Sequence, residues 1–576
     1  MIILLTSLAL AETFSVPMSD GTALATDVHT PSGAGPWPTI LRRTPYGRSF
    51  DADTIAAVNG LGYALVSQDV RGRGDSEGEF RPFFDDASDG VDTVAWVASQ
   101  SWSDGHMSMY GGSAESIVQL LAAGEGAPGL DAIQPFQGTP DLRRSLYPGG
   151  AWRKDLTTDW LKSLGERGAE AALREHEADS DFWDAVRLDQ DELAATDAAM
   201  LLVGGFFDIF EGELAATPGA LAAAGSDAEV WMIYGPWTHG GAGNAAQGEV
   251  SFPDAVYGDY ITELFQLYDY KLKGGARPSW APVRYAVSTF ADARATASSV
   301  WIEADTWPPP GTRERLYLGA EGLGAASDGE PVQLEVDPDD PVPSVGGGNL
   351  NSASGVYDQA EVDARDDVLV AELGARDEAV TLAGDLSATI WAASATTDAD
   401  VIVRVEVVPP SGKVWLVADG VRRGRFVAGE DEIRPLTPGE PARFEIDLGP
   451  IAVTLPPGHL LRIALSGTLA PRYEVNPNEA VALSEDPDPV PTTLTIYRDA
   501  DHPSSVVVPL TDGTLGGEPV TDAPEDTGAD PDSDPDDGPK GASGCQCGAG
   551  RFSPAGLAWM LALGAMVTRR RRAGPR

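Results

Sequence analysis

Ser113 is the first residue whose setting points to chemistry. It lies in MYGGSAESIVQLLAAG, where the residues before Gly111 favour a strand, Gly111 and Gly112 a sharp turn, and those after Glu115 a helix. A serine at such a junction has the geometry of a nucleophile elbow, which exposes its hydroxyl at the carboxyl edge of a sheet. The sequence departs from G-x-S-x-G because Glu115 replaces the second glycine. A lone Gly-x-Ser sequence is more often an ordinary turn than a nucleophile elbow, so the assignment of Ser113 depends on the other residues that a catalytic serine needs.

A catalytic serine needs a base, and the chain has six histidines. Only His239 follows a strand-like run, VWMIYGPWTH, after the serine and within the part of the chain where strands and helices alternate. His29 and His106 lie before the serine, His176 lies in a helical insertion, and His459 and His502 lie in the C-terminal part. Elimination therefore predicts His239 as the base.

Asp208 is the candidate for the residue that orients the base. It ends the apolar run AMLLVGGFFD, so it also follows a strand-like segment. Ser113, Asp208 and His239 then occur in the chain order of α/β-hydrolases. The alternative, three unrelated loop residues, requires a coincidence of both order and position.

These residues need a sheet to position them, and residues 12–300 alternate short apolar runs with helical stretches. This pattern predicts a mostly parallel sheet covered on both faces, with function at the carboxyl ends of its strands. Residues 142–199 are helix-like without strand signals, which predicts a helical cap. Residues 301–515 contain short alternating runs between Pro and Gly turns and no helix signal, which predicts an all-β sandwich or jelly roll.

The sequence resembles the cocaine esterase and X-Pro dipeptidyl-peptidase group (CocE/NonD) of serine hydrolases over about residues 14–511. The motifs that carry the resemblance are RRTPYGR, QDVRGRGDSEGEF, DASDGVDTVAWVASQSWSDGHMSMYGGS, GGFFDIF and GPWTH, followed by PVPSVGGG, ARDDVL and GDLSATIWAAS. The resemblance implies an α/β-hydrolase domain with a helical cap, followed by a galactose-binding-like jelly-roll domain. It also implies that the Tyr46 hydroxyl and the Ala114 backbone N–H form the oxyanion hole.

The nucleophile motif departs from that group's G-x-S-Y-x-G pattern. Ala114 keeps the backbone donor but lacks the aromatic ring, and Ser116 replaces a glycine where a helix packs closely on a strand. Glu115 lies where related α-amino-acid ester hydrolases carry a glutamate, and no binding role is transferred to it. These departures leave catalysis intact and put the acyl specificity in question.

The expected activity is hydrolysis of esters or amides of small acyl compounds through an acyl-enzyme, without metal or organic cofactor. The resemblance leaves X-Pro dipeptidyl-peptidase or α-amino-acid ester hydrolase activity as alternatives. A catalytically inactive protein that binds at the cell surface is an alternative of another class. The 88 acidic and 40 basic residues give a net charge of −48, which argues against nucleic acid as a partner.

The two ends of the chain point to export. Residues 1–11 are apolar and end in Ala-Leu-Ala, which favours a signal peptide over a first strand. Residues 516–544 read as an acidic Asp/Pro-rich linker. Residues 545–576 begin with Cys545 and Cys547, continue with a short apolar stretch and end in an arginine cluster.

This C-terminal segment resembles the myxobacterial sorting tail (MYXO-CTERM). The resemblance implies processing near Cys545 and Cys547 and retention at the cell surface through the membrane. A soluble amphipathic helix is the alternative, but the apolar stretch has no polar face.

Overall fold

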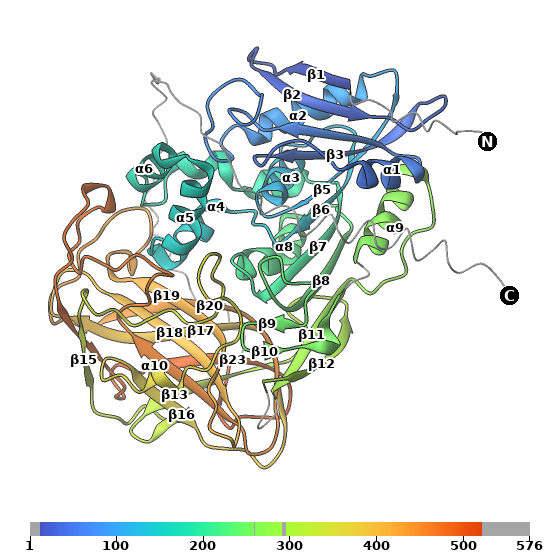
Figure 1. Ribbon diagram of the computed structural model, residues 1–576. Helices are drawn as coiled ribbons and strands as arrows, with labels where there is room; N and C mark the ends of the chain where they lie inside the picture. The colour runs from blue at the N-terminus through green and yellow to red at the C-terminus, as the bar shows by residue number, and fades with distance from the viewer. Residues whose placement is uncertain (1–11, 258–259, 291–294, 521–576) are drawn as a thin grey trace, which may run out of the picture.

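The computed structural model describes residues 12–257, 260–290 and 295–520 (Figure 1). The predicted signal peptide, most of the predicted linker and the predicted sorting tail with Cys545 and Cys547 lie outside these residues. Within them, no helix is both long and apolar enough to cross a membrane.

The N-terminal half is built on one mostly parallel sheet, in the order β1-β2-β4-β3-β5-β6-β7-β8-β11-β12. Every pair from β4 to β11 is parallel, whereas the pairs at both edges are antiparallel. The strands are β1 (Glu12–Pro17), β2 (Ala23–His29), β3 (Trp37–Thr44), β4 (Ala64–Asp69), β5 (Ser103–Gly112), β6 (Leu130–Phe136), β7 (Ala199–Phe207), β8 (Val230–Thr238), β11 (Val283–Phe290) and β12 (Ala297–Ala304). The apolar runs of the sequence are therefore confirmed as strands.

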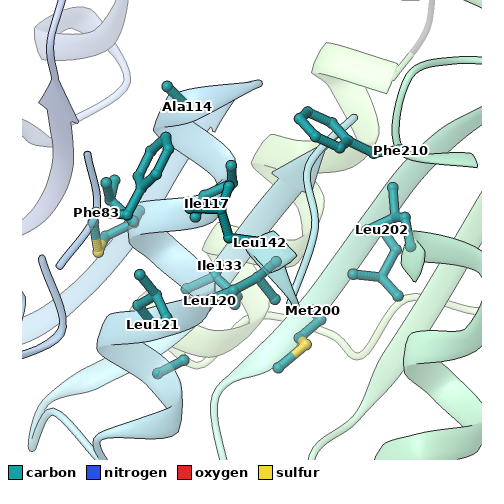
Figure 2. Close-up of a cluster of buried hydrophobic side chains, with 14 of the residues drawn as sticks. Phe83, Ala114, Ile117, Leu120, Leu121, Ile133, Leu142, Met200, Leu202 and Phe210 are labelled. Atoms are coloured by element: carbon teal, nitrogen blue, oxygen red, sulfur yellow. The ribbon is translucent and has the colours of Figure 1, made fainter. Parts of the chain in front are cut away.

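Helices cover both faces of this sheet, which explains why strands such as β3, β4, β7 and β8 are buried along almost their whole length. One core lies beneath α2 (Asp86–Ala98), α3 (Ala114–Gly124) and α8 (Glu211–Ala224). Figure 2 shows Ile117, Leu120 and Leu121 of α3 in this core, packed against Ile133 of β6 and Met200 of β7. The other core lies beneath α1 (Ala52–Gly60) and α9 (Tyr260–Lys273).

A group of helices lies between β6 and β7, where the sequence predicts the cap. It contains α4 (Leu142–Leu146), η1 (Pro148–Gly150), α5 (Lys154–Leu164), α6 (Arg167–Glu175), η2 (Asp181–Val186) and α7 (Gln190–Ala195). Figure 1 shows α4, α5 and α6 against one end of the β-rich half, where η1 contacts β19 and α6 contacts η5. The cap therefore contacts both halves of the chain.

The C-terminal half is β-rich, with two sheets around a core of aliphatic side chains. Its strands are β13 (Thr312–Gly319), β14 (Gly322–Gly324), β15 (Val332–Val336), β16 (Leu369–Leu373), β17 (Val380–Ser394), β18 (Asp400–Val408), β19 (Trp415–Arg423), β20 (Ala442–Leu455), β21 (Leu460–Ser466), β22 (Thr492–Ile496), β23 (Ser505–Asp512) and β24 (Glu518–Pro519). The short elements β9 (Ala246–Gln247), β10 (Val250–Ser251) and η3 (Pro253–Ala255) precede this half.

An α/β-hydrolase domain followed by a β-rich domain is thus confirmed, whereas the jelly-roll connectivity stays a prediction. Two details of the sequence prediction are wrong. A short helix, α10 (Ala360–Asp363), and two 3-10 turns, η4 (Gly424–Phe426) and η5 (Leu483–Glu485), interrupt the expected all-β segment. In addition, β24 lies inside the predicted linker and pairs with β13, because its backbone groups complete that strand's edge.

Candidate active site

Ser113 lies at the carboxyl end of β5, at the first turn into α3. Its backbone has φ 62° and ψ −124°, an unfavourable conformation for a residue with a side chain. Its N–H donates to the Phe136 carbonyl at 3.0 Å, which fixes the turn against the neighbouring strand β6. The side chain remains partly exposed, so the hydroxyl can meet a substrate. This is the sharp strand–turn–helix geometry that the sequence predicts.

Both glycines before Ser113 are required by close packing. A Cβ added to Gly111, which has φ 135°, would lie 2.5 Å from the Glu115 side chain. A Cβ added to Gly112 would approach the Phe136 carbonyl oxygen to 3.2 Å. The turn therefore accepts Glu115 because Gly111 leaves it room.

The serine at position 116 is likewise accommodated by a glycine elsewhere. A Cβ on Gly138 would lie 2.1 Å from the Ser116 hydroxyl oxygen, so Gly138 supplies the space that the missing glycine would have given. Ser116 itself is fully buried. Helix α3 can therefore pack closely against the loop after β6 although position 116 is a serine.

Glu115 lies in the wall beside Ser113 and has little exposure. Burial raises the pKa of its carboxyl, while Arg42, whose Nε is 3.9 Å from a carboxylate oxygen, and the Thr44 hydroxyl oppose the rise. Glu115 therefore places a titratable carboxyl group beside Ser113, where the usual glycine would place none.

Asp208 and His239 follow β7 and β8 and meet at the same edge of the sheet as Ser113. The Nδ1 of His239 lies 2.7 Å from Oδ2 of Asp208, and the second carboxylate oxygen accepts the Phe210 N–H at 2.9 Å. Asp208 is 1% exposed, and the His239 side chain retains 15% exposure. A buried carboxylate at Nδ1 leaves Nε2 as the nitrogen that can take a proton.

The other five histidines lie in structural surroundings. His106 pairs with Asp131 at the amino end of β5, and His176 stacks on Phe182 in the cap. His29 is buried in β2, and His459 is buried against the carbonyl at the end of β11. His502 pairs with Asp499. None of these five is in contact with Asp208, whereas His239 is.

Tyr46 follows β3, and its hydroxyl lies next to Ser113. The residue is 46% exposed, but its hydroxyl end contacts Trp160, whose indole N–H donates to it at 3.0 Å. Desolvation of that end raises the pKa of the phenol to about 12, and hydrogen bonds with Trp160 and Ser113 oppose the rise. The phenol therefore stays protonated and able to donate throughout the neutral pH range.

Ala114 is the first residue of α3 and is 2% exposed. The first N–H groups of a helix have no acceptor within the helix, and the helix dipole places positive charge there. The Ala114 N–H thus offers a second donor beside the Ser113 hydroxyl, as the sequence comparison implies.

Gln137, which the sequence did not suggest, fixes the backbone on both sides of His239. It follows β6 in a left-handed conformation with φ 50° and is 1% exposed. Its side-chain amide donates to the Thr238 carbonyl at 2.9 Å and accepts the Gly240 N–H at 2.5 Å. The Gln247 side-chain oxygen accepts hydrogen bonds from the N–H and the hydroxyl of Thr238. Two glutamines therefore hold the backbone that carries the His239 imidazole.

We expect Gln137→Asn to lower kcat by about 10–100-fold with little change in KM. Asparagine tolerates the left-handed backbone but is one methylene too short to reach both peptide groups, and small misplacements of a catalytic group have effects of this size. Steady-state hydrolysis measurements test this, with Gln100→Ala, just after the C-terminal end of α2, as the control. An unchanged kcat would show that Gln137 does not determine the position of His239.

A loop of the β-rich half reaches the backbone around Asp208. The Arg153 guanidinium donates to the carbonyl of Ile209 at 2.6 Å and to that of Gly348 at 2.8 Å. A Cβ on Gly348 would lie 2.5 Å from the Asp208 carbonyl oxygen, so only glycine fits. The Asp155 carboxylate next to Arg153 accepts the backbone N–H groups of residues 350 and 351 and the Ser352 hydroxyl. The loop that carries Asp208 is therefore held from both halves of the chain.

Glu211, three residues after Asp208, faces two arginines in the same interface. Burial raises the pKa of its carboxyl to about 7, whereas Arg153 and Arg472 oppose the rise. Its oxygens lie 3.9 Å from Arg153 and 3.7 Å from Arg472. The interface behind Asp208 thus contains a carboxyl group between two arginines.

Two family models match the chain. Residues 20–171 match X-Pro dipeptidyl-peptidase (S15 family), and residues 278–507 match the X-Pro dipeptidyl-peptidase C-terminal non-catalytic domain. Among curated proteins, the chain is 29% identical to a cocaine esterase from Rhodococcus sp. (strain MB1 Bresler), over 87% of this chain and 98% of the esterase.

Two solved structures share the fold over 87% of this chain and 96% of their own lengths. One is an aminopeptidase from a marine sediment archaeon, Thaumarchaeota archaeon, with a TM-score of 0.75 and 23% identity. The other is an α-amino acid ester hydrolase, with a TM-score of 0.72 and 23% identity. The similarity therefore extends across both halves of the chain.

Proposed function

Because its two halves match X-Pro dipeptidyl-peptidase models and most of its length matches a cocaine esterase, we propose that the chain is a serine hydrolase that cleaves ester or amide bonds of small acyl compounds through an acyl-enzyme. Ser113 is the nucleophile, His239 the base and Asp208 the residue that orients it. The observation that carries this assignment is the 2.7 Å contact between Asp208 and His239 at the sheet edge where Ser113 occupies its elbow.

In the first half of the reaction, the Ser113 oxygen bonds to the substrate carbonyl carbon while its proton passes to Nε2 of His239. The carbonyl oxygen becomes an oxyanion, which accepts hydrogen bonds from Tyr46 and the Ala114 N–H. When the tetrahedral intermediate collapses, the bond to the leaving group breaks and the leaving group takes the proton from His239.

In the second half, a water molecule gives a proton to His239 and attacks the acyl carbon. The same two donors stabilise the second oxyanion. Collapse breaks the bond to Ser113, which recovers its proton from His239 as the acid leaves. Donors aimed at the oxyanion typically contribute about 10²–10³ in rate each, so Tyr46 is a large part of this proposal.

The exposure of the site and the family match bear on the class of substrate. Tyr46 is half exposed, so the reacting edge is open to solvent and favours small acyl groups with varied leaving groups. X-Pro dipeptidyl-peptidase activity is the second candidate, because the S15 match spans β3, the elbow and the start of the cap. The match to enzymes over both halves weighs against an inactive surface-binding protein.

The test combines active-site labelling with a substrate panel. A fluorophosphonate should label Ser113 in the folded protein, and mass spectrometry of the labelled peptide identifies the residue. The panel consists of p-nitrophenyl esters, amino-acid esters and X-Pro anilides, compared by kcat/KM. Highest kcat/KM on simple esters supports the first candidate, and highest kcat/KM on X-Pro anilides supports the second. Absence of labelling together with absence of turnover would contradict both.

We also propose that the enzyme is exported and retained at the cell surface through residues 545–576, with processing near Cys545 and Cys547. The order of acidic linker, cysteine pair, apolar stretch and arginine cluster supports this proposal. Fractionation of cells that express the chain with and without residues 545–576 tests it. Equal release of both forms into the medium would contradict it.

A further inference from the structure

Trp160 of the cap contacts the tyrosine that the proposed mechanism uses. Its indole N–H donates to the Tyr46 hydroxyl oxygen at 3.0 Å, across 114 residues of sequence. Trp160 lies in the middle of α5, whereas Tyr46 lies on the loop after β3. The contact therefore joins the cap to the catalytic sheet at the reacting edge.

A phenol oxygen can accept hydrogen bonds and has a single proton to donate. When an indole N–H occupies the acceptor side, the phenol proton must point elsewhere, and Ser113 is near enough to the same hydroxyl to influence its pKa. A donor that is itself hydrogen-bonded is polarised and donates more strongly. The Trp160 contact therefore both aims the proton and strengthens the bond that it makes.

The contact also fixes the orientation of the Tyr46 phenol. The residue is 46% exposed although its hydroxyl end is desolvated, so without the Trp160 N–H the phenol proton could rotate away from the substrate. An oxyanion donor is effective only when it is oriented before the reaction, because reorientation during the step removes the benefit. A fixed N–H donor is a simple way to orient a half-exposed phenol.

Trp160 is itself fixed by its neighbours. Its ring stacks on Phe83, with centroids 5.7 Å apart and planes 5° apart, and Phe83 is buried. A second connection runs beside it: the Arg73 guanidinium donates to the Pro45 carbonyl and to the Leu164 carbonyl, each at 3.3 Å. The end of α5 and the loop that carries Tyr46 are thus joined twice.

We propose that Trp160 is a positioning residue for the oxyanion hole, and that the cap completes this hole only while α5 is docked on the Tyr46 loop. The inference rests on the proposed function, in which Tyr46 donates to the oxyanion. It gives the cap a role in the chemical step.

The test is a double-mutant cycle with Trp160→Phe, Tyr46→Phe and both together, measured as kcat and KM on p-nitrophenyl acetate and as the rate constant of fluorophosphonate labelling. Tyr46→Phe should lower kcat by about 10²-fold. Trp160→Phe keeps the stacked ring but removes the N–H, and it should lower kcat by about 10-fold with KM within about twofold. In the Tyr46→Phe background, Trp160→Phe should have no further effect.

Trp280→Phe is the matched control, because Trp280 packs against Trp231 at the amino end of β8, far from the reacting edge. Losses from the two single variants that multiply in the double variant would overturn the inference, since Trp160 would then act independently of Tyr46. An unchanged kcat in Trp160→Phe, beside a reduced kcat in Tyr46→Phe, would also overturn it while the proposed function stands. A wild-type enzyme that neither hydrolyses nor labels would contradict the proposed function itself.

Discussion

Ser113→Ala is expected to lower kcat by about 10⁴–10⁶-fold, the largest effect of any single substitution in this chain. The alanine variant has no atom that can bond to the substrate carbonyl carbon, so the acyl-enzyme cannot form. Only direct attack by water remains, helped by the donors of the oxyanion hole and by substrate binding. Substrate binding should change little, because the lost hydroxyl is small and partly exposed.

The variant is measured by hydrolysis of p-nitrophenyl esters and by fluorophosphonate labelling, which should disappear. Ser116→Ala is the matched control, since Ser116 lies one turn further along the same helix, is fully buried and faces Gly138. Retention of wild-type activity by Ser113→Ala would exclude Ser113 as the nucleophile, whatever the control does.

Asp208→Asn is expected to lower kcat by about 10⁴-fold, the second largest effect. The carboxylate accepts the Nδ1–H of His239 at 2.7 Å and thereby leaves Nε2 without a proton. An asparagine can turn its N–H₂ toward Nδ1, which favours the tautomer with its proton on Nε2, so the imidazole can no longer accept the serine proton. The geometry stays nearly unchanged, which separates this effect from a folding defect.

The reduced kcat should recover partly as pH rises, because hydroxide can then replace the missing base. The pH dependence of kcat from pH 6 to 10 measures this. Asp131→Asn is the control, since Asp131 makes a similar contact to His106, 3.0 Å long, at the opposite edge of the sheet. If both variants lost activity equally, the effect would not belong to the candidate site.

The catalytic sheet and the residues at its strand ends could be predicted because each depends on local sequence. An apolar run ending in a polar loop residue places Asp208 and His239, and a pair of glycines before Ser113 makes the turn possible. All three are found at carboxyl ends of parallel strands. Such ends gather function in α/β sheets, so the pattern alone was sufficient to predict that the three residues lie at one edge, while their catalytic roles stay a proposal.

The supporting residues could not be predicted because their roles depend on contacts across the chain. Gln137 reads as an ordinary loop residue, and neither its left-handed backbone nor its reach to both sides of His239 is visible in the sequence. Trp160 reads as one apolar position of an amphipathic helix, and its indole N–H gains meaning only beside Tyr46. A partial signal existed for Gly348, which is the last glycine of PVPSVGGG, one of the motifs that carry the resemblance described above.

The interface around Arg153 and Gly348 also determines when the enzyme can first act. These two residues, joined by a hydrogen bond beside the Asp208 loop, are 195 residues apart along the chain. At roughly 5–20 residues per second, a ribosome needs about 10–40 s to synthesise the stretch between them. In the later part of that interval, once β8 and His239 have been made, the sheet with Ser113 and His239 can begin to fold while the loop that carries Asp208 still lacks its outer support. Hydrolytic activity should therefore appear only after the β-rich half has been made, which delays it until the chain is nearly complete.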